Sequence, residues 1–168
     1  HDSLRLHGGQ RLASDECVMC HNAVKGDEDR RPAALFPQES IAFKRLIHRI
    51  HTGEHLTQDF TVYGFGGSVN NFNEVRFPGD RRNCAKCHTP GSYLLPLPTG
   101  EDNVTTLRDY FSPQGPATAA CLGSHDSRDA AAHAYLNTTT FGGTNPAEAC
   151  ATCHGVGKHW DVAKVHPH

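Results

Sequence analysis

The sequence predicts a fold that is mostly coil with short α-helices and little or no β-structure, closed around something other than an aliphatic core. Leu, Ile, Val and Phe make up only 32 of the 168 residues, a share at which a chain rarely builds its own apolar core. Two residue types are over-represented, with 13 His and 7 Cys. The length predicts a single domain over residues 1–168, and that domain needs metals, disulfides or a cofactor to fold.

Charge, hydropathy and cysteine count exclude several classes of protein. The 16 basic and 18 acidic residues give a net charge of −2 without a polybasic block, so nucleic acid is not an expected partner. No apolar run approaches the roughly 18 residues of a membrane-spanning helix. Seven cysteines cannot form a complete set of internal disulfides. The chain starts at His1 without a signal peptide, as expected of a processed form or a fragment.

Six of the seven cysteines form three copies of one motif, C-x-x-C-H. The copies are Cys17, Cys20 and His21; Cys84, Cys87 and His88; and Cys150, Cys153 and His154. This is the attachment motif of c-type haem, because two thiols at this spacing can add to two vinyl groups on one porphyrin edge while the next residue binds iron. Zinc knuckles and redox dithiols also use C-x-x-C, but neither needs a histidine directly after every pair. Haem is therefore favoured, and the predicted fold is a multihaem cytochrome c whose closely packed haems form the core.

The seventh cysteine extends the pattern incompletely. Cys121 and His125 keep the spacing of the motif, but Ser124 replaces the second cysteine. One interpretation is a fourth haem held by a single thioether at Cys121, with iron bound by His125. The alternative is an unrelated cysteine near an unrelated histidine. The first interpretation predicts four haems in total, three with two thioethers and one with a single thioether.

The remaining histidines exceed the number of open axial positions. Methionine is the usual competitor for such a position, but the one methionine, Met19, lies inside the first motif and cannot reach across its own haem. The second axial ligands are therefore expected to be histidines, which makes every iron six-coordinate and low-spin. A six-coordinate iron has no open position for a substrate, which favours electron transfer over catalysis.

Residues 40–51 hold the best pair of second axial ligands. A short amphipathic helix is predicted there by a nearby cap and by apolar residues at helical spacing, namely Ser40, Ile41, Leu46, Ile47 and Ile50. His48 and His51 lie three residues apart on one face and should serve two different haems. His55, beyond Gly53, is a weaker candidate, and solvated histidines are the alternative.

Two candidates lie near the later motifs. His133 belongs to the alanine-rich segment 127–134, a predicted helix whose small side chains let a flat ring approach the backbone. His166 follows the last motif and is a second candidate, with His159 beside Trp160 as its competitor.

Local signals predict three further elements. Ser14 is expected to cap a helix that carries the first motif. Residues 57–67 alternate weakly and predict a strand or an extended loop. Residues 145–148, Asn-Pro-Ala-Glu, have the composition of a helix start. That helix would carry Cys150, Cys153 and His154.

Three segments give the chain a family resemblance: residues 47–54 (IHRIHTGE), 75–84 (VRFPGDRRNC) and 150–155 (CATCHG). Together they resemble a pentahaem domain of the outer-surface decahaem cytochromes of metal-reducing bacteria, the OmcA/MtrC family. The resemblance covers nearly the whole chain. Of the two pentahaem domains in such a cytochrome, the chain resembles the C-terminal one. Residues 1–9 look like the end of that domain's first motif, cut between Cys and His. His1 would then be that motif's histidine and His7 a nearby ligand.

The predicted function is electron transfer through closely spaced haems with two histidine ligands each, and not enzymatic catalysis. The resemblance implies extracellular electron transfer to minerals, flavins or other cytochromes, by an exported protein at the outer cell surface or outside the cell rather than in the periplasm. Two alternatives stay open. One is a multihaem reductase of a small oxyanion, which needs a haem with an open position. The other is a self-assembling subunit of a haem filament, in which His1, His7 or His168 binds the haem of a neighbouring subunit.

Overall fold

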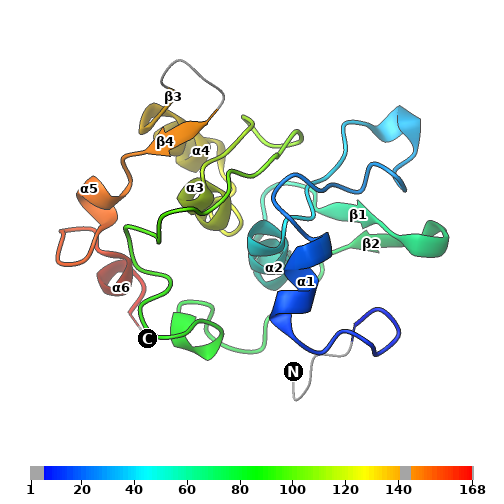
Figure 1. The fold of residues 1–168 in the computed structure, drawn as a ribbon, viewed down its shortest axis with the longest axis horizontal. Coiled ribbons are helices and arrows are strands. Elements are labelled where there is room, and N and C mark those ends of the chain that lie inside the picture. The colour runs from blue at the N-terminus through cyan, green and yellow to red at the C-terminus, as the bar shows by residue number, and fades with distance from the viewer. Residues whose placement is uncertain (1–5, 141–144, 168) are drawn as a thin grey trace.

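Short helices joined by long irregular segments make up most of the structure. The computed structural model describes residues 6–140 and 145–167. The α-helices are α1 (Ser14–Cys20), α2 (Phe43–Thr52), α3 (Pro116–Cys121), α4 (Arg128–Leu136), α5 (Ala151–His154) and α6 (Val162–Val165). Single 3-10 turns cover Ala33–Leu35, Gly53–His55, Phe65–Gly67 and Cys84–Lys86. In Figure 1, α2 lies near the centre, with α1 on one side and α3 to α6 on the other.

Two small antiparallel sheets show that the prediction of little or no β-structure is wrong. Strand β1 (Thr61–Tyr63) pairs with β2 (Val69–Asn71), and β3 (Thr138–Thr140) pairs with β4 (Pro146–Glu148). Threonine, valine and tyrosine favour strands. The weak alternation of residues 57–67 does contain β1, whereas three successive threonines in β3 have no alternation to reveal a strand. Strand β1 thus lies in the segment predicted as a strand or an extended loop, whereas β4 lies where a helix start was predicted.

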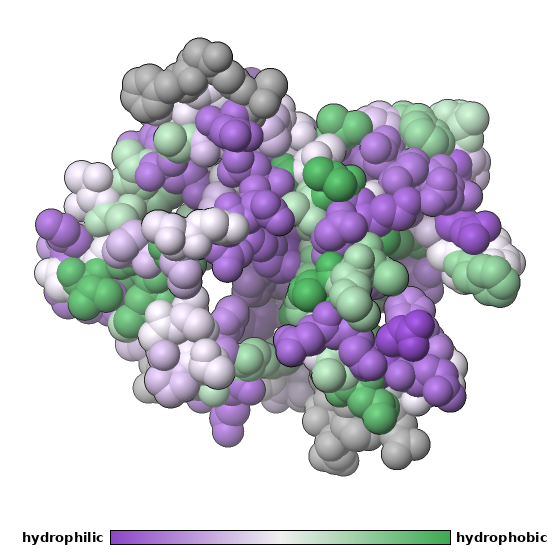
Figure 2. Space-filling view, viewed as in Figure 1, coloured by the Kyte–Doolittle hydropathy of each residue, from purple (hydrophilic) through white to green (hydrophobic). Residues whose placement is uncertain are grey.

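The centre of the protein is polar, which corrects the prediction of coil wrapped around a core of haems. Among the described residues, the buried apolar side chains larger than alanine are Leu46, Phe60, Leu95, Val104 and Leu122. The two largest fully buried side chains are arginines, Arg45 and Arg49. Figure 2 shows polar and apolar residues intermixed over one face, which is hollowed near its middle. The interior formed by the described residues is therefore rich in polar and charged side chains.

Buried ion pairs hold α2 in place. Arg45 donates from Nη1 to Glu39 Oε1 at 2.8 Å and from Nη2 to Asp109 Oδ2 at 3.0 Å. Arg49 Nη2 lies 3.7 Å from Asp126 Oδ2. Because a charge buried without a partner is costly, these pairs tie α2 to Glu39 just before it and to two distant segments of the chain, at Asp109 and Asp126.

The predicted helix at 40–51 is confirmed as α2, but its buried face differs from the expected apolar one. Its buried residues are Arg45, Leu46, Arg49 and Thr52. The helix is capped at Ala42, and the Ser40 hydroxyl accepts from the Ala42 N–H at 3.4 Å. The charged face points inward because partner carboxylates come from elsewhere in the chain, which the local pattern cannot reveal.

The predicted helix at 127–134 is confirmed, and the cap predicted for the first helix is wrong. Ser127 caps α4 by accepting from the Ala130 N–H at 3.2 Å, as the predicted helix at 127–134 requires. Ser14 is the first residue of α1 rather than its cap. The Glu16 carboxylate accepts from the N–H groups of Leu12 and Ala13 at 2.9 and 3.2 Å at this end of α1.

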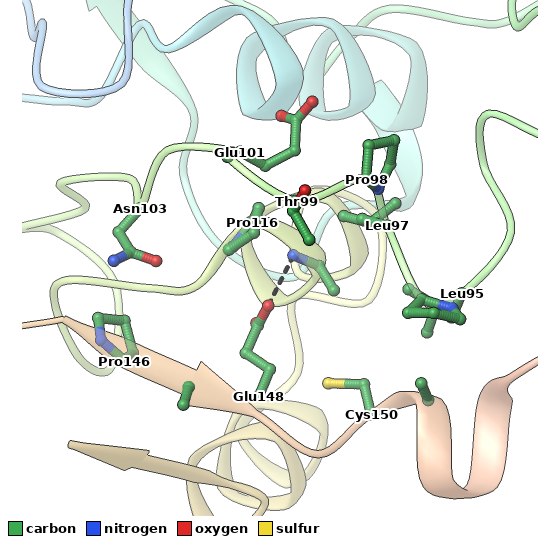
Figure 3. A pocket seen from close by; sticks show the side chains of 15 residues that line it. Leu95, Leu97, Pro98, Thr99, Glu101, Asn103, Pro116, Pro146, Glu148 and Cys150 are labelled. Carbon is green, nitrogen blue, oxygen red and sulfur yellow. Dashed lines mark hydrogen bonds between the residues drawn. The ribbon is translucent and has the colours of Figure 1, made fainter. Parts of the chain in front are cut away.

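The predicted helix start at 145–148 is wrong, because these residues lie in or beside β4. Glu148 acts at a different helix: its carboxylate accepts from the N–H groups of Ala117 and Thr118 at 2.9 and 2.7 Å, in the first turn of α3. Figure 3 shows this contact between β4 and α3. Only the short α5, starting after Cys150, carries the end of the third motif.

Replacing Glu148 by glutamine should lower the free energy of unfolding by about 1 kcal/mol, the usual cost of losing a helix cap and its negative charge. The neutral amide has one acceptor oxygen for two N–H groups. Chemical denaturation of the purified protein measures the change. Glu74→Gln, at an exposed carboxylate, is the matched control, and an equal loss in both variants would contradict the capping role.

Candidate functional site

All four Cys-to-His segments fold into the same turn. The backbone N–H of His21 donates to the carbonyl of Cys17 at 2.8 Å, and His88, His125 and His154 make the equivalent bond to the residue four positions earlier at 2.9, 2.8 and 2.9 Å. One helical turn therefore places each first cysteine and its histidine close together. This happens on α1, on the 3-10 turn at Cys84–Lys86, after α3, and on α5.

Each of these histidines has a second histidine opposite it. Ring centroids lie 6.0 Å apart for His7 and His21, and 6.0 Å apart for His48 and His88. The other two pairs are His125 with His166 at 5.9 Å, and His133 with His154 at 6.1 Å. The structure thus brings together residues separated by up to 41 positions in the sequence, from four different parts of the chain.

The separation within these pairs matches a shared metal ion. An imidazole nitrogen binds a transition metal at about 2 Å, and the centre of the ring lies ~1 Å further back. Two imidazoles on opposite sides of one ion therefore have centroids about 6 Å apart. The space in each pair would therefore accommodate a metal ion held by both rings.

Backbone carbonyls orient three of these rings. The Nδ1 atoms of His21, His154 and His166 lie 2.9, 3.0 and 3.0 Å from the carbonyl oxygens of Ile41, Trp160 and Val162. A carbonyl only accepts, so Nδ1 carries the proton and Nε2 presents a lone pair. This is the arrangement that metal-binding histidines use.

Burial keeps two further rings in the neutral form that binds metals. It lowers the pKa of His48 and the pKa of His125 below the ordinary value. The same physical effect raises the pKa of the Cys84 and Cys150 thiols, and raises the pKa of Cys121 to about 11. None of the seven cysteines forms a disulfide.

Two pockets adjoin motif residues. The first, which we call the Cys150 pocket, has a volume of about 500 Å³ and lies between residues 95–101 and the segment from β4 to α5. Figure 3 shows the Cys150 sulfur directed into it. The second, the His21 pocket, has about 410 Å³ and is lined by Val18, His21 and the start of α2. Both volumes fall in the range of about 300–1,000 Å³ that holds small ligands and cofactors.

The other candidate histidines are not in the four pairs. The His51 ring lies 5.2 Å from the ring of Phe77. His55 is exposed, 4.0 Å from Glu54, and His159 packs edge-on against Trp160 at 4.8 Å. His166 rather than its competitor His159 therefore faces a motif histidine. His1 and His168 lie outside the described residues.

The chain matches a known protein family over almost its whole length. Residues 1–167 match the family model described as "Outer membrane cytochrome MtrC/MtrF-like, domains II/IV". The chain belongs to this family. Its members are multihaem cytochromes of the outer membrane that transfer electrons, and the chain is accordingly an exported protein of the outer cell surface. The predicted OmcA/MtrC relationship is thus confirmed.

A solved structure of a family member is similar over the same span. It is described as the crystal structure of the outer membrane decaheme cytochrome OmcA, and the chain matches it with 25% identity and a TM-score of 0.57. The match covers 97% of the chain and 21% of OmcA. No curated protein matches the chain. None of the helices described is both long and apolar enough to cross a membrane.

The predicted number of four haems needs correction. The family description names domains II/IV of an outer membrane cytochrome and assigns no haem to them. At the incomplete motif, the Ser124 hydroxyl is hydrogen-bonded to the Thr52 hydroxyl at 2.9 Å, and Thr52 is bonded to the carbonyl of His48 at 2.8 Å. The count of four, with a single thioether at Cys121, is therefore not retained.

Sequence reasoning also missed residues that position the site. Arg45 and Arg49 fix the helix that carries His48, and Glu101 lies on the wall of both pockets. The sequence does hold one signal, because both arginines lie on the same helical face as Leu46 and Thr52. Residues at this spacing can form the buried face of a helix. The carboxylate partners are too far away in sequence to be matched with them.

Proposed function

We propose that the chain transfers electrons through haem attached at its complete C-x-x-C-H motifs, with two histidines on each iron. The observation that carries the proposal is the pairing of each motif histidine with a second histidine at about 6 Å: His21 with His7, His88 with His48, and His154 with His133. Bound haem supplies reversible one-electron chemistry at iron. The motif thiols would anchor it, and the paired histidines would bind its iron.

The same pairs argue for an electron carrier rather than an enzyme. When two imidazoles occupy both axial positions, no position is left for a substrate such as an oxyanion. A haem filament joined through His7 is disfavoured, because His7 faces His21 of its own chain. Electron transfer within and out of this chain therefore fits the arrangement better than a reductase or a filament joined through His7.

The partners we propose are other cytochromes and extracellular acceptors such as minerals or flavins. The chain spans about a fifth of the length of OmcA, so the partners of a whole protein of this kind are also a proposal. Cys20, Cys87 and Cys153 are all exposed, so the attached edge of each porphyrin would lie near the surface. Electrons can then pass to a partner without a change in fold.

The spin state of the iron tests this proposal. Electron paramagnetic resonance of the oxidised wild-type protein should give low-spin signals only. His133→Ala opens one axial position, so a high-spin signal should appear for one haem and should disappear when imidazole is added. His133 is exposed, so the variant should still fold.

His159→Ala is the matched control, because His159 is equally exposed but packs against Trp160. It should leave the spectrum unchanged. High-spin iron in the wild-type protein would contradict the proposed ligation and favour the reductase alternative, and an unchanged spectrum in His133→Ala would contradict the assignment of His133 as a ligand. Absence of covalently bound haem on a denaturing gel would contradict the function as a whole.

A further inference from the structure

The incomplete motif packs along the helix that carries His48. Three contacts join residues 123–126, which follow α3, to α2: Gly123 lies against His48, Ser124 is hydrogen-bonded to Thr52, and Asp126 pairs with Arg49. The ring of His48 in turn faces the ring of His88, which belongs to the complete motif at Cys84 and Cys87. The incomplete motif is therefore in direct contact with a residue that serves another motif.

Gly123 leaves no space for a side chain against His48. A Cβ at Gly123 would lie 2.7 Å from the Cβ of His48, whereas an ordinary contact is 3.4 Å or longer. The φ of Gly123 lies outside the left-handed region that favours glycine, so the lack of space alone requires a glycine here. The Cβ of His48 is attached directly to the helix backbone and cannot turn aside as the end of a long side chain could. Gly123 thus fixes how closely the incomplete motif approaches His48.

A chain of two hydrogen bonds supports His48 one turn further along α2. Thr52 Oγ1 donates to the carbonyl of His48 at 2.8 Å, and the hydroxyl oxygens of Ser124 and Thr52 are 2.9 Å apart. Since each hydroxyl has one proton, Ser124 donates to Thr52 when Thr52 donates to His48. Thr52 is 1% exposed, so water has little access to replace these bonds. The serine that interrupts the motif is therefore bonded to the helix of His48.

Backbone hydrogen bonds hold the supporting turn in place. The N–H groups of Ser124 and His125 both donate to the carbonyl of Cys121, at 3.0 and 2.8 Å. Just beyond the turn, the Asp126 carboxylate accepts from the N–H of Thr57 at 2.9 Å, which ties the turn to the segment after α2. Because the turn is fixed at both ends, it can support a side chain of the neighbouring helix.

The His48 and His88 rings are the most nearly parallel of the four histidine pairs. Their planes lie at 15°, whereas the planes of the other pairs lie at 29°, 49° and 86°. We propose that the incomplete motif positions an axial ligand of a neighbouring haem, with Gly123 and Ser124 holding His48 parallel to His88. This inference rests on the proposed function, in which both rings bind one iron. Residues behind a metal ligand fix its orientation and so tune the metal.

Electron paramagnetic resonance of the oxidised, haem-loaded protein tests the proposal. Two parallel imidazole planes separate the energies of the two iron d orbitals that share the unpaired electron, whereas perpendicular planes leave them nearly equal and raise the largest g-value. His48→Ala identifies the component of this haem, which should become high-spin and return to low-spin when imidazole is added. Gly123→Ala should raise the largest g-value of that component, because the new Cβ displaces His48, and should leave the other components unchanged.

Two milder variants keep the test decisive if Gly123→Ala does not take up haem. Ser124→Ala and Thr52→Val each break the hydroxyl chain without adding a heavy atom, and should move the same component by a smaller amount. Thr52→Ser keeps the hydroxyl and should give the wild-type signal. Gly79→Ala is the matched control, because a Cβ at Gly79 would meet no atom closer than 3.4 Å.

The outcomes separate this inference from the function on which it rests. If the component of the His48 haem is unchanged in haem-loaded Ser124→Ala and Thr52→Val, or if every low-spin component shifts equally, the inference is overturned and the proposed function stays intact. An unchanged spectrum in His48→Ala would overturn the assignment of His48 as a ligand, and the inference with it. A chain without covalent haem would overturn both the inference and the proposed function.

Discussion

Protein produced without haem attachment should show no cooperative thermal unfolding transition. The buried apolar cluster of the described residues consists of Ala42, Val104 and Ala119, which is too little to offset the conformational entropy of ordering a chain of this length. Large apolar side chains stay at the surface instead, with Met19, Phe65 and Leu136 being 71%, 86% and 81% exposed. Haem would supply apolar contacts that these residues do not make with one another.

Circular dichroism during heating measures this effect. The test protein carries serine in place of the six motif cysteines, and the control is the wild-type protein matured with haem in an exporting host. The control should unfold cooperatively, and the variant should lose its signal gradually. A cooperative transition in the haem-free chain would contradict the prediction and would assign the stability to the protein's polar interior alone.

Replacing Arg45 by methionine should lower the free energy of unfolding by about 3–5 kcal/mol, the usual cost of removing one partner of a buried ion pair. Arg45 bonds Glu39 and Asp109, and the side chains of all three are at most 3% exposed. Methionine fills similar space but leaves two carboxylates without their cation. A loss of this size is a large part of the stability of a typical domain, and chemical denaturation measures it.

The loss in Arg45→Met should shrink as the pH falls. Burial raises the pKa of Glu39 above its ordinary value. A carboxyl group whose pKa is raised by folding contributes stability at pH values below its unfolded pKa, and that contribution is lost as the pH rises through the folded pKa. Removing the Arg45 cation strengthens this pH dependence of stability. The free energy of unfolding that Arg45→Met loses is therefore largest near neutral pH.

Arg76→Met is the matched control for Arg45→Met. Arg76 pairs with Glu54 at 3.3 Å, but its side chain is 84% exposed, so solvent already screens the pair and little stability should be lost. Equal losses in the two variants would contradict the role assigned to the buried network.

Local chemistry made part of the site predictable. The C-x-x-C-H motifs follow from spacing alone, the helix at residues 43–52 follows from the spacing of its apolar residues, and the helix at residues 128–136 follows from its alanine-rich composition. His48, His133, His166 and His7 were also among the predicted ligands. Each of these signals lies within a few residues, where covalent geometry and helical repeat restrict what the chain can do.

The sequence by itself determined which residues can carry the chemistry, because thiol spacing and imidazole supply are properties of composition and order. Only the tertiary structure decided which histidine faces which: His133 pairs with His154, and His166 with His125. It alone also revealed the buried partners of Arg45, the action of Glu148 at α3, and the wall shared by two pockets at Glu101. These relations join segments far apart in the chain. They depend on the folded backbone bringing charges and rings within bonding distance, which no local pattern encodes.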